Sequence, residues 1–232
     1  MTDYTHEFYK DRDHATRYAA ETILGLVLKQ IPPVMSAFDI GCGVGTWLSV
    51  LKEKHGVADI TGCDGPWVDP NLMKIPYDCF QYVELDKRMP ESTRRYDLAI
   101  SLEVAEHLPE ARAAEFVQYL ASLSDTVLFS AAIPGQGGTG HVNEQWPKYW
   151  ADLFWSHGYA TQDTLRKAIW WDAQIPFWYR QNAMLFVKGQ AHTGSPLSLV
   201  HPKLYLSHAK PGVKGSIKKV CHAVRAYASL SI

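Results

Sequence analysis

The feature that most constrains the fold is a glycine-rich segment between a predicted strand and a predicted helix. The segment reads Phe38-Asp39-Ile40-Gly41-Cys42-Gly43-Val44-Gly45-Thr46-Trp47. Glycine, which has no Cβ, allows a tight turn and lets a ligand approach the backbone closely. The spacing is Gly-x-Gly-x-Gly and differs from the Gly-x-Gly-x-x-Gly fingerprint of dinucleotide-binding folds. The segment therefore predicts the first strand, ligand loop and helix of an α/β domain.

Strand and helix patterns alternate on both sides of this loop, and an amphipathic helix is expected over 14–30 before it. Expected strands cover 36–40, 58–63, 79–85, 96–101, 126–131, 159–165 and 182–188, with further helices over 112–123 and 147–157. Such alternation predicts a doubly wound, mostly parallel seven-stranded sheet with helices on both faces. We expect a domain over 1–190 and an extension over 191–232.

Charge is unevenly distributed, although the formal net charge is only -1. No Asp or Glu follows Ala173, and a basic amphipathic helix is expected over 216–229. This extension could dock on a membrane surface, a nucleic acid or a partner, or be a solvated tail. No apolar run of 18 residues and no signal-peptide pattern is present, and the four cysteines lack metal-type spacing. These features predict a cytoplasmic protein with reduced thiols.

Acidic residues stand at the ends of the first three expected strands: Asp39, Asp64 and Asp86. With the glycine loop and the segment 96–108, YDLAISLEVAEHL, they make the chain resemble the class I S-adenosylmethionine (SAM)-dependent methyltransferases over 12–188. The resemblance implies that Asp39, Gly41 and Gly43 hold the methionine part of SAM, Asp64 its ribose and Asp86 its adenine. The remaining residues predicted to bind the cofactor are Cys42, Gly65, Leu102, Glu103 and His107.

Two polar clusters are candidates for acceptor chemistry, because ligands in such sheets bind beyond the carboxyl ends of the strands. The first is Glu103, Glu106 and His107, which could act as a base, bind a metal or be structural. The second is the segment 141–146, HVNEQW, after a glycine-rich loop. Here His141 is the preferred general base, since its ordinary pKa lies near neutrality; alternatively, Asn143 caps the next helix and His141 only packs. The predicted catalytic residues are His141, Glu144 and His107.

An aromatic segment over 169–179 could stack on a sugar or another ring, or could belong to the core. The predicted substrate-binding residues are Asn143, Trp146, Trp171 and Arg180. Together with the HVNEQWPKYW segment, the later WYRQN is similar to methyltransferases of glycan and polysaccharide modification. This resemblance implies O-methylation of a saccharide or sugar-containing small molecule. A divalent metal is permitted by the Glu and His residues, but their spacing predicts no metal site.

Two other functions compete with this reading. The basic extension suggests a nucleic-acid methyltransferase. However, the fifth expected strand is followed by Ala132-Ile133-Pro134-Gly135 and not by an Asn/Asp-Pro-Pro-aromatic motif that grips a flipped base, so we expect no nucleic-acid substrate. The other alternative is a noncatalytic protein of the same fold that docks through its basic extension.

Overall fold

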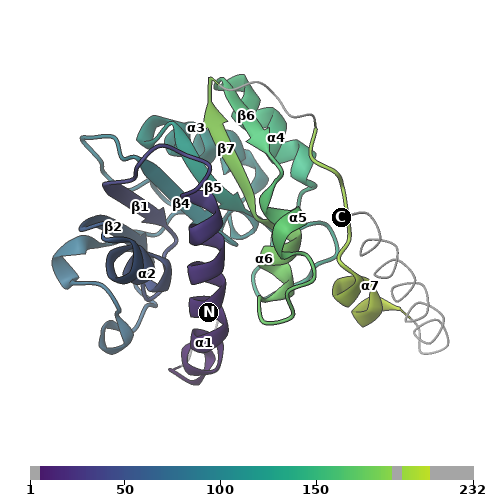
Figure 1. Ribbon diagram of the computed structural model, residues 1–232, viewed down its shortest axis with the longest axis horizontal. Helices are drawn as coiled ribbons and strands as arrows, with labels where there is room; N and C mark the ends of the chain where they lie inside the picture. Colours follow the sequence, from purple (N-terminus) through teal and green to yellow (C-terminus); the bar gives the residue numbers. More distant parts are fainter. Residues whose placement is uncertain (1–5, 190–194, 210–232) are drawn as a thin grey trace. The chain divides into compact units, whose positions relative to one another are not determined.

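The computed structural model describes residues 6–189 and 195–209 (Figure 1). In chain order the elements are α1 His6–Val27, β1 Ser36–Ile40, α2 Thr46–His55, β2 Asp59–Asp64, η1 Pro70–Leu72, η2 Tyr77–Cys79, β3 Phe80–Tyr82, β4 Leu98–Leu102, η3 Ala105–His107, η4 Glu110–Arg112, α3 Ala113–Leu123, β5 Thr126–Ser130, α4 Pro147–Ser156, β6 Tyr159–Gln162, α5 Leu165–Ile169, α6 Phe177–Asn182, β7 Met184–Lys188 and α7 Pro202–His208. The chain divides into two compact units, Met1–Ser198 and Leu199–Ile232. The expected boundary after residue 190 stays a prediction, and the expected basic helix over 216–229 lies outside the described residues.

The first unit contains a seven-stranded sheet in the order β3-β2-β1-β4-β5-β7-β6. Strands β1 to β5 pair in parallel, and β7 runs antiparallel to both β5 and β6. This confirms the predicted fold class. The chain order reverses where β1 lies between β2 and β4, and a crevice for ligands opens at such a switch point, beyond the carboxyl ends of the strands.

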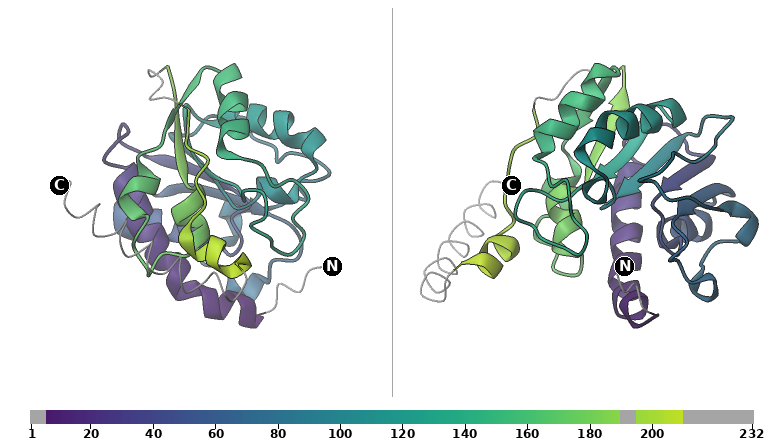
Figure 2. Two further views of the ribbon diagram at one scale, coloured as in Figure 1. Left: turned by 90° about the vertical axis from the view of Figure 1, so that its right-hand side faces the viewer. Right: turned by 180° about the vertical axis from the view of Figure 1, so that it is seen from behind.

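Alternate strand residues enter the two cores on opposite faces of the sheet, as the two-residue period of a strand requires. Leu98 and Ile100 of β4 pack with buried residues of α1, α2 and α5. Ala99, between them, packs with buried residues of α3 and α4. Figures 1 and 2 show these helices on the two sides of the sheet. Strands buried on both faces explain why the sequence reads as near-continuous apolar runs here.

Several element lengths differ from the sequence-based expectation. The strand expected over 79–85 is limited to Phe80–Tyr82, because Glu84 begins a turn in which its carbonyl accepts hydrogen bonds from the amides of Lys87 and Arg88. The start of the strand expected over 182–188 is helical, since α6 continues through Asn182. The sequence did not reveal this difference because strand and helix periodicities cannot be told apart over such short apolar segments.

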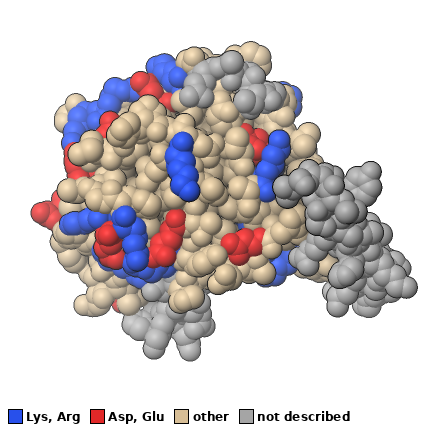
Figure 3. Space-filling model, in the orientation of Figure 1, with Lys and Arg blue, Asp and Glu red and all other residues tan. Residues whose placement is uncertain are grey.

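Two surface properties bear on the predicted partners. On the face in Figure 3, basic and acidic side chains intermingle. Ion pairs of the described residues include those of Arg17 with Glu21 and Glu53. Among the described residues, no helix has the length and apolar character needed to cross a membrane.

Candidate active site

The glycine-rich loop joins β1 to α2 at the switch point of the sheet. Gly41, Gly43 and Gly45 all have positive φ, of 80°, 55° and 83°. A Cβ on Gly41 would lie 2.3 Å from a methyl carbon of Val104, in the loop after β4. The side chain of Val104 therefore fills the space where the loops after β1 and β4 meet and leaves no room for a Cβ on Gly41. Cys42, predicted to bind the cofactor, is buried, and its thiol donates to the carbonyl of Gly43 at 3.5 Å.

Two carboxylates stand beside this loop, on the buried Asp39 and the partly buried Asp64. Asp64 accepts hydrogen bonds from the amides of Gly43 and Gly65, both at 2.7 Å, and so ties β2 to the loop. Burial raises the pKa of Asp64, against the lowering effect of these amides and of Trp67. Burial, followed by the charge of Asp64, raises the pKa of Asp39 well above its ordinary value. A cationic ligand would stabilise the ionised pair, and the sulfonium and ammonium groups of SAM fit this requirement.

Trp67 lies beside Asp64 and Gly65, two residues predicted to bind the cofactor. The ring of Trp67 covers Gly65, where a Cβ would lie 2.2 Å from it, and Trp67 is 48% exposed. Sequence reasoning missed Trp67; an aromatic residue three positions after a strand-end Asp was the available signal. Asp86 is exposed in the turn after β3, and its contact with adenine stays a prediction.

A third carboxylate stands at the end of β4, on the partly buried Glu103. Its backbone has a φ of 57°, the single positive value of a non-glycine residue in the described part of the chain. The carboxylate accepts hydrogen bonds from Gln136 at 2.9 Å and from Asn182 at 3.0 Å. Burial raises the pKa of Glu103, and these bonds oppose the shift. A strained backbone marks a position that structure or function maintains against a cost of about 1–3 kcal/mol. The preceding Leu102 is buried in the core.

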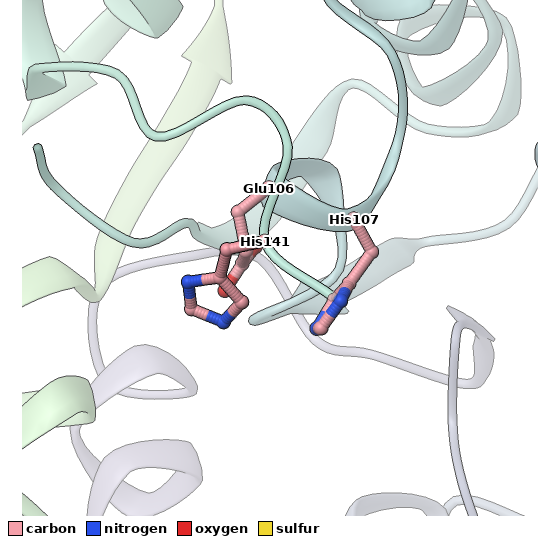
Figure 4. A group of neighbouring side chains, drawn as sticks. All are labelled: Glu106, His107 and His141. Carbon is pink, nitrogen blue, oxygen red and sulfur yellow. The ribbon is translucent and has the colours of Figure 1, made fainter. Parts of the chain in front are cut away.

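A group of imidazole and carboxylate side chains lies beyond β4 and β5 (Figure 4). His107 and His141 meet edge to face, with ring centroids 4.9 Å apart. Nδ1 of His141 lies 2.9 Å from Glu144, which also accepts hydrogen bonds from the amides of Gly135 and Gly137, both at 2.7 Å. Although burial opposes it, these hydrogen bonds lower the pKa of Glu144. The structure thus brings the three predicted catalytic residues together.

Burial and neighbouring charge shift the pKa values of Glu106 and His107, the two residues of η3 in this group. Burial, and then His141, lowers the pKa of His107, so its neutral form is favoured. Burial, and then the charge of Glu103, raises the pKa of Glu106 well above its ordinary value.

The four predicted substrate-binding residues occupy different surroundings. Asn143 is buried, and its carbonyl oxygen accepts a hydrogen bond from Gln145. The alternative that Asn143 caps α4 is wrong, because Trp146 occupies the N-cap position and no side chain caps that end. Trp146 itself is 38% exposed.

The other two belong to the α5–α6 segment. Trp171 contacts Trp170 edge to face, and Arg180 is buried and donates to the carbonyl of Trp170 at 3.2 Å. The next two residues of α6 contact Gln136, which itself donates to Glu103. Gln181 and Asn182 both donate to Gln136, at 3.0 and 2.9 Å. Both amides belong to the WYRQN segment that the sequence analysis singled out, although Arg180 alone of that segment was predicted to bind substrate.

Comparisons with known proteins show the family and the fold of the chain. A family model described as "Methyltransferase domain" matches residues 11–170. No curated protein matches the sequence. Among solved structures, magnesium protoporphyrin IX methyltransferase from Synechocystis PCC 6803 with bound SAH is 18% identical, with a TM-score of 0.56 over 82% of this chain and 90% of that chain.

Two further solved structures show the same fold. The plantazolicin methyltransferase, in complex with a pentazolic desmethyl analogue and SAH, is 15% identical, with a TM-score of 0.56 over 79% of this chain and 89% of that chain. Human N-acetylserotonin methyltransferase in complex with SAM is 15% identical, with a TM-score of 0.50 over 75% of this chain and 52% of that chain. The chain therefore belongs to the methyltransferase domain family and is a SAM-dependent methyltransferase.

Proposed function

We propose that the chain methylates a hydroxyl group of a saccharide or sugar-containing small molecule. The observation that carries this proposal is the pair of His141 and Glu144. The carboxylate is fixed by two backbone amides and accepts a hydrogen bond from Nδ1 of the imidazole. An oxygen acceptor needs such a base, because a neutral hydroxyl is a weak nucleophile and must lose its proton.

The proton path follows from the tautomer that Glu144 imposes. An ionised carboxylate only accepts hydrogen bonds, so Nδ1 of His141 carries the hydrogen and Nε2 keeps a free lone pair. SAM, when bound, supplies a methyl group from its sulfonium. The acceptor oxygen takes this methyl group, S-adenosylhomocysteine leaves, and the hydroxyl proton passes to Nε2 of His141. Glu144 then stabilises the imidazolium.

The surroundings of the pair support a polar acceptor. The exposed ring of Trp146 follows the same loop, and exposed aromatic rings offer a face on which a sugar can stack. The similar solved structures do not restrict the acceptor class, since their names include a porphyrin, plantazolicin and N-acetylserotonin. The saccharide therefore rests on the site and on the sequence resemblance.

The test is transfer of a labelled methyl group from SAM to paired acceptors. Each glycoside with free hydroxyls is compared with its fully O-blocked form, and an amine panel runs beside them. We expect label only on the free glycosides, and we expect His141→Asn to abolish most of it. The matched control is His55→Asn, since His55 is exposed at the end of α2. Labelling of amines alone, or full activity of His141→Asn, would overturn the proposal.

A further inference from the structure

Glu106, His107 and His141 converge beyond the carboxyl ends of β4 and β5 (Figure 4). One potential ligand atom from each side chain lies within 4.8 Å of the other two. A single cation at ordinary ligand distances of about 2.0–2.2 Å requires donor atoms about 3–4 Å apart, so small side-chain adjustments would suffice. The proposed role of His141 as a general base, with Glu144 as its partner, does not involve Glu106 and so does not explain why Glu106 lies here.

The backbone holds the group together. Glu106 and His107 lie in η3 directly after β4, and His141 lies in the loop after β5. The amides of Val142 and Asn143 donate to the carbonyl of Glu106 at 2.8 and 3.0 Å. The loop that carries His141 is therefore attached to the residue that carries the carboxylate. These backbone hydrogen bonds help to keep the three side chains close together.

The carboxylate of Glu106 is the observation that points to a ligand. Glu106 is 0% exposed, and neither of its carboxylate oxygens makes a hydrogen bond within the part of the chain that the structure describes. The backbone amides of Glu106 itself and Ala132 lower the pKa of this carboxylate, against the larger effect of burial. Burying a carboxylate without partners is costly, and buried charges in proteins are paired or coordinate metals. A cation between Glu106 and the two imidazoles would supply the missing partner.

Both imidazoles are arranged as metal-binding histidines usually are. Nδ1 of His141 faces Glu144 at 2.9 Å, and Nδ1 of His107 faces the carbonyl of Gly140 at 3.3 Å. A ring N–H that donates to a carboxylate or carbonyl fixes the tautomer and leaves Nε2 as a ligand. The hydrogen bonds that orient metal-binding imidazoles are thus already present at both histidines.

We propose that Glu106, His107 and His141 bind a divalent first-row transition metal ion, such as Mn²⁺, Co²⁺ or Zn²⁺. Two imidazole nitrogens and one carboxylate oxygen favour these ions over Mg²⁺ and Ca²⁺, which prefer oxygen ligands alone. Three protein ligands leave coordination positions open. In its catalytic role, which rests on the proposed function, an open position takes the acceptor's hydroxyl oxygen.

Bound to the ion, the hydroxyl has a lowered pKa and releases its proton to water, after which the oxygen takes the methyl group. His141 then acts as a metal ligand, and Glu144 orients it. The ion thus takes over the task of the imidazole base, on the same acceptor and with the same products.

The experiment measures metal binding to the full chain, without acceptor. Chelator-stripped protein is titrated with Co²⁺, whose visible absorption reports its coordination, and then with Zn²⁺ and Mn²⁺ by calorimetry. The variants are Glu106→Gln and His141→Asn, and their matched controls are Glu110→Gln and His55→Asn, at exposed positions. Far-UV circular dichroism and SAM titration show whether each variant is folded.

We expect one saturable site per chain, at least a tenfold loss of affinity in both variants and no loss in either control. Glu106→Gln keeps the size of the side chain and removes its charge, so the fold should persist. Absence of saturable binding, equal affinity in the variants, or displacement of Co²⁺ by an equal concentration of Mg²⁺ would overturn the metal site. Because no acceptor is present, the result is independent of the acceptor screen. Methylation by metal-free protein would refute the catalytic role of the ion and would leave the proposed function in place.

Discussion

Gly41→Ala should destabilise the fold more than the same change at another left-handed glycine. Gly41 has a φ of 80°, and its new Cβ would lie 2.3 Å from one methyl carbon of Val104 and 3.0 Å from the other. Gly56, after α2, has a φ of 72°, and no other described atom would lie within 4 Å of its Cβ. The backbone cost is about 1–2 kcal/mol at either position. Overpacking adds about 1–3 kcal/mol at Gly41 alone.

The expected losses in the free energy of unfolding are therefore about 2–5 kcal/mol for Gly41→Ala and about 1–2 kcal/mol for Gly56→Ala. Urea unfolding followed by circular dichroism measures both. Val104→Ala in the Gly41→Ala background should restore much of the difference, because it removes the crowded methyl groups. SAM affinity, measured by calorimetry, should fall only for Gly41→Ala. Equal destabilisation by the two single changes would refute the steric reasoning.

Three further predictions concern the carboxylates and the base. Asp64→Ala should weaken SAM binding by about 2 kcal/mol in calorimetric titration, because the ribose loses a charged acceptor and the amides of Gly43 and Gly65 lose theirs; unchanged affinity would remove Asp64 from the site. Since burial raises the pKa of Asp39, the folded cofactor-free chain binds this proton more tightly than the unfolded chain, so stability should decline as pH rises from the ordinary aspartate pKa toward the raised one. Asp39→Asn should flatten that decline in thermal unfolding series while weakening SAM binding, and an unchanged slope would contradict the shift. His141→Asn should lower turnover by roughly 10²–10⁴-fold, with SAM affinity preserved, in steady-state kinetics and calorimetry; a wild-type rate would exclude a role in proton removal or metal-assisted transfer.

The fold could be predicted because its signals are local. The strand, glycine loop and helix around Gly41 use short-range periodicity and backbone geometry, which any segment carries in its own sequence. The acidic residues at the ends of β1 and β2 could be predicted in the same way, since parallel strands end at one edge of the sheet. Strand limits were less well predicted: β3 ends at Tyr82 because a turn at Glu84 outweighs the β propensity of its neighbours.

The sequence by itself determined the family, the order of the elements and the side of the sheet on which the chemistry lies. Only the tertiary structure decided which polar groups meet. Glu103 and Asn182 are 79 positions apart and pair through a hydrogen bond, and Glu106 contributes an unpartnered buried carboxylate beside His141. The physical reason is that burial and hydrogen-bond partners depend on packing between distant segments. Periodicity places a residue on a strand end, but the side chain's neighbours are fixed only when the loops after β4 and β5 pack together.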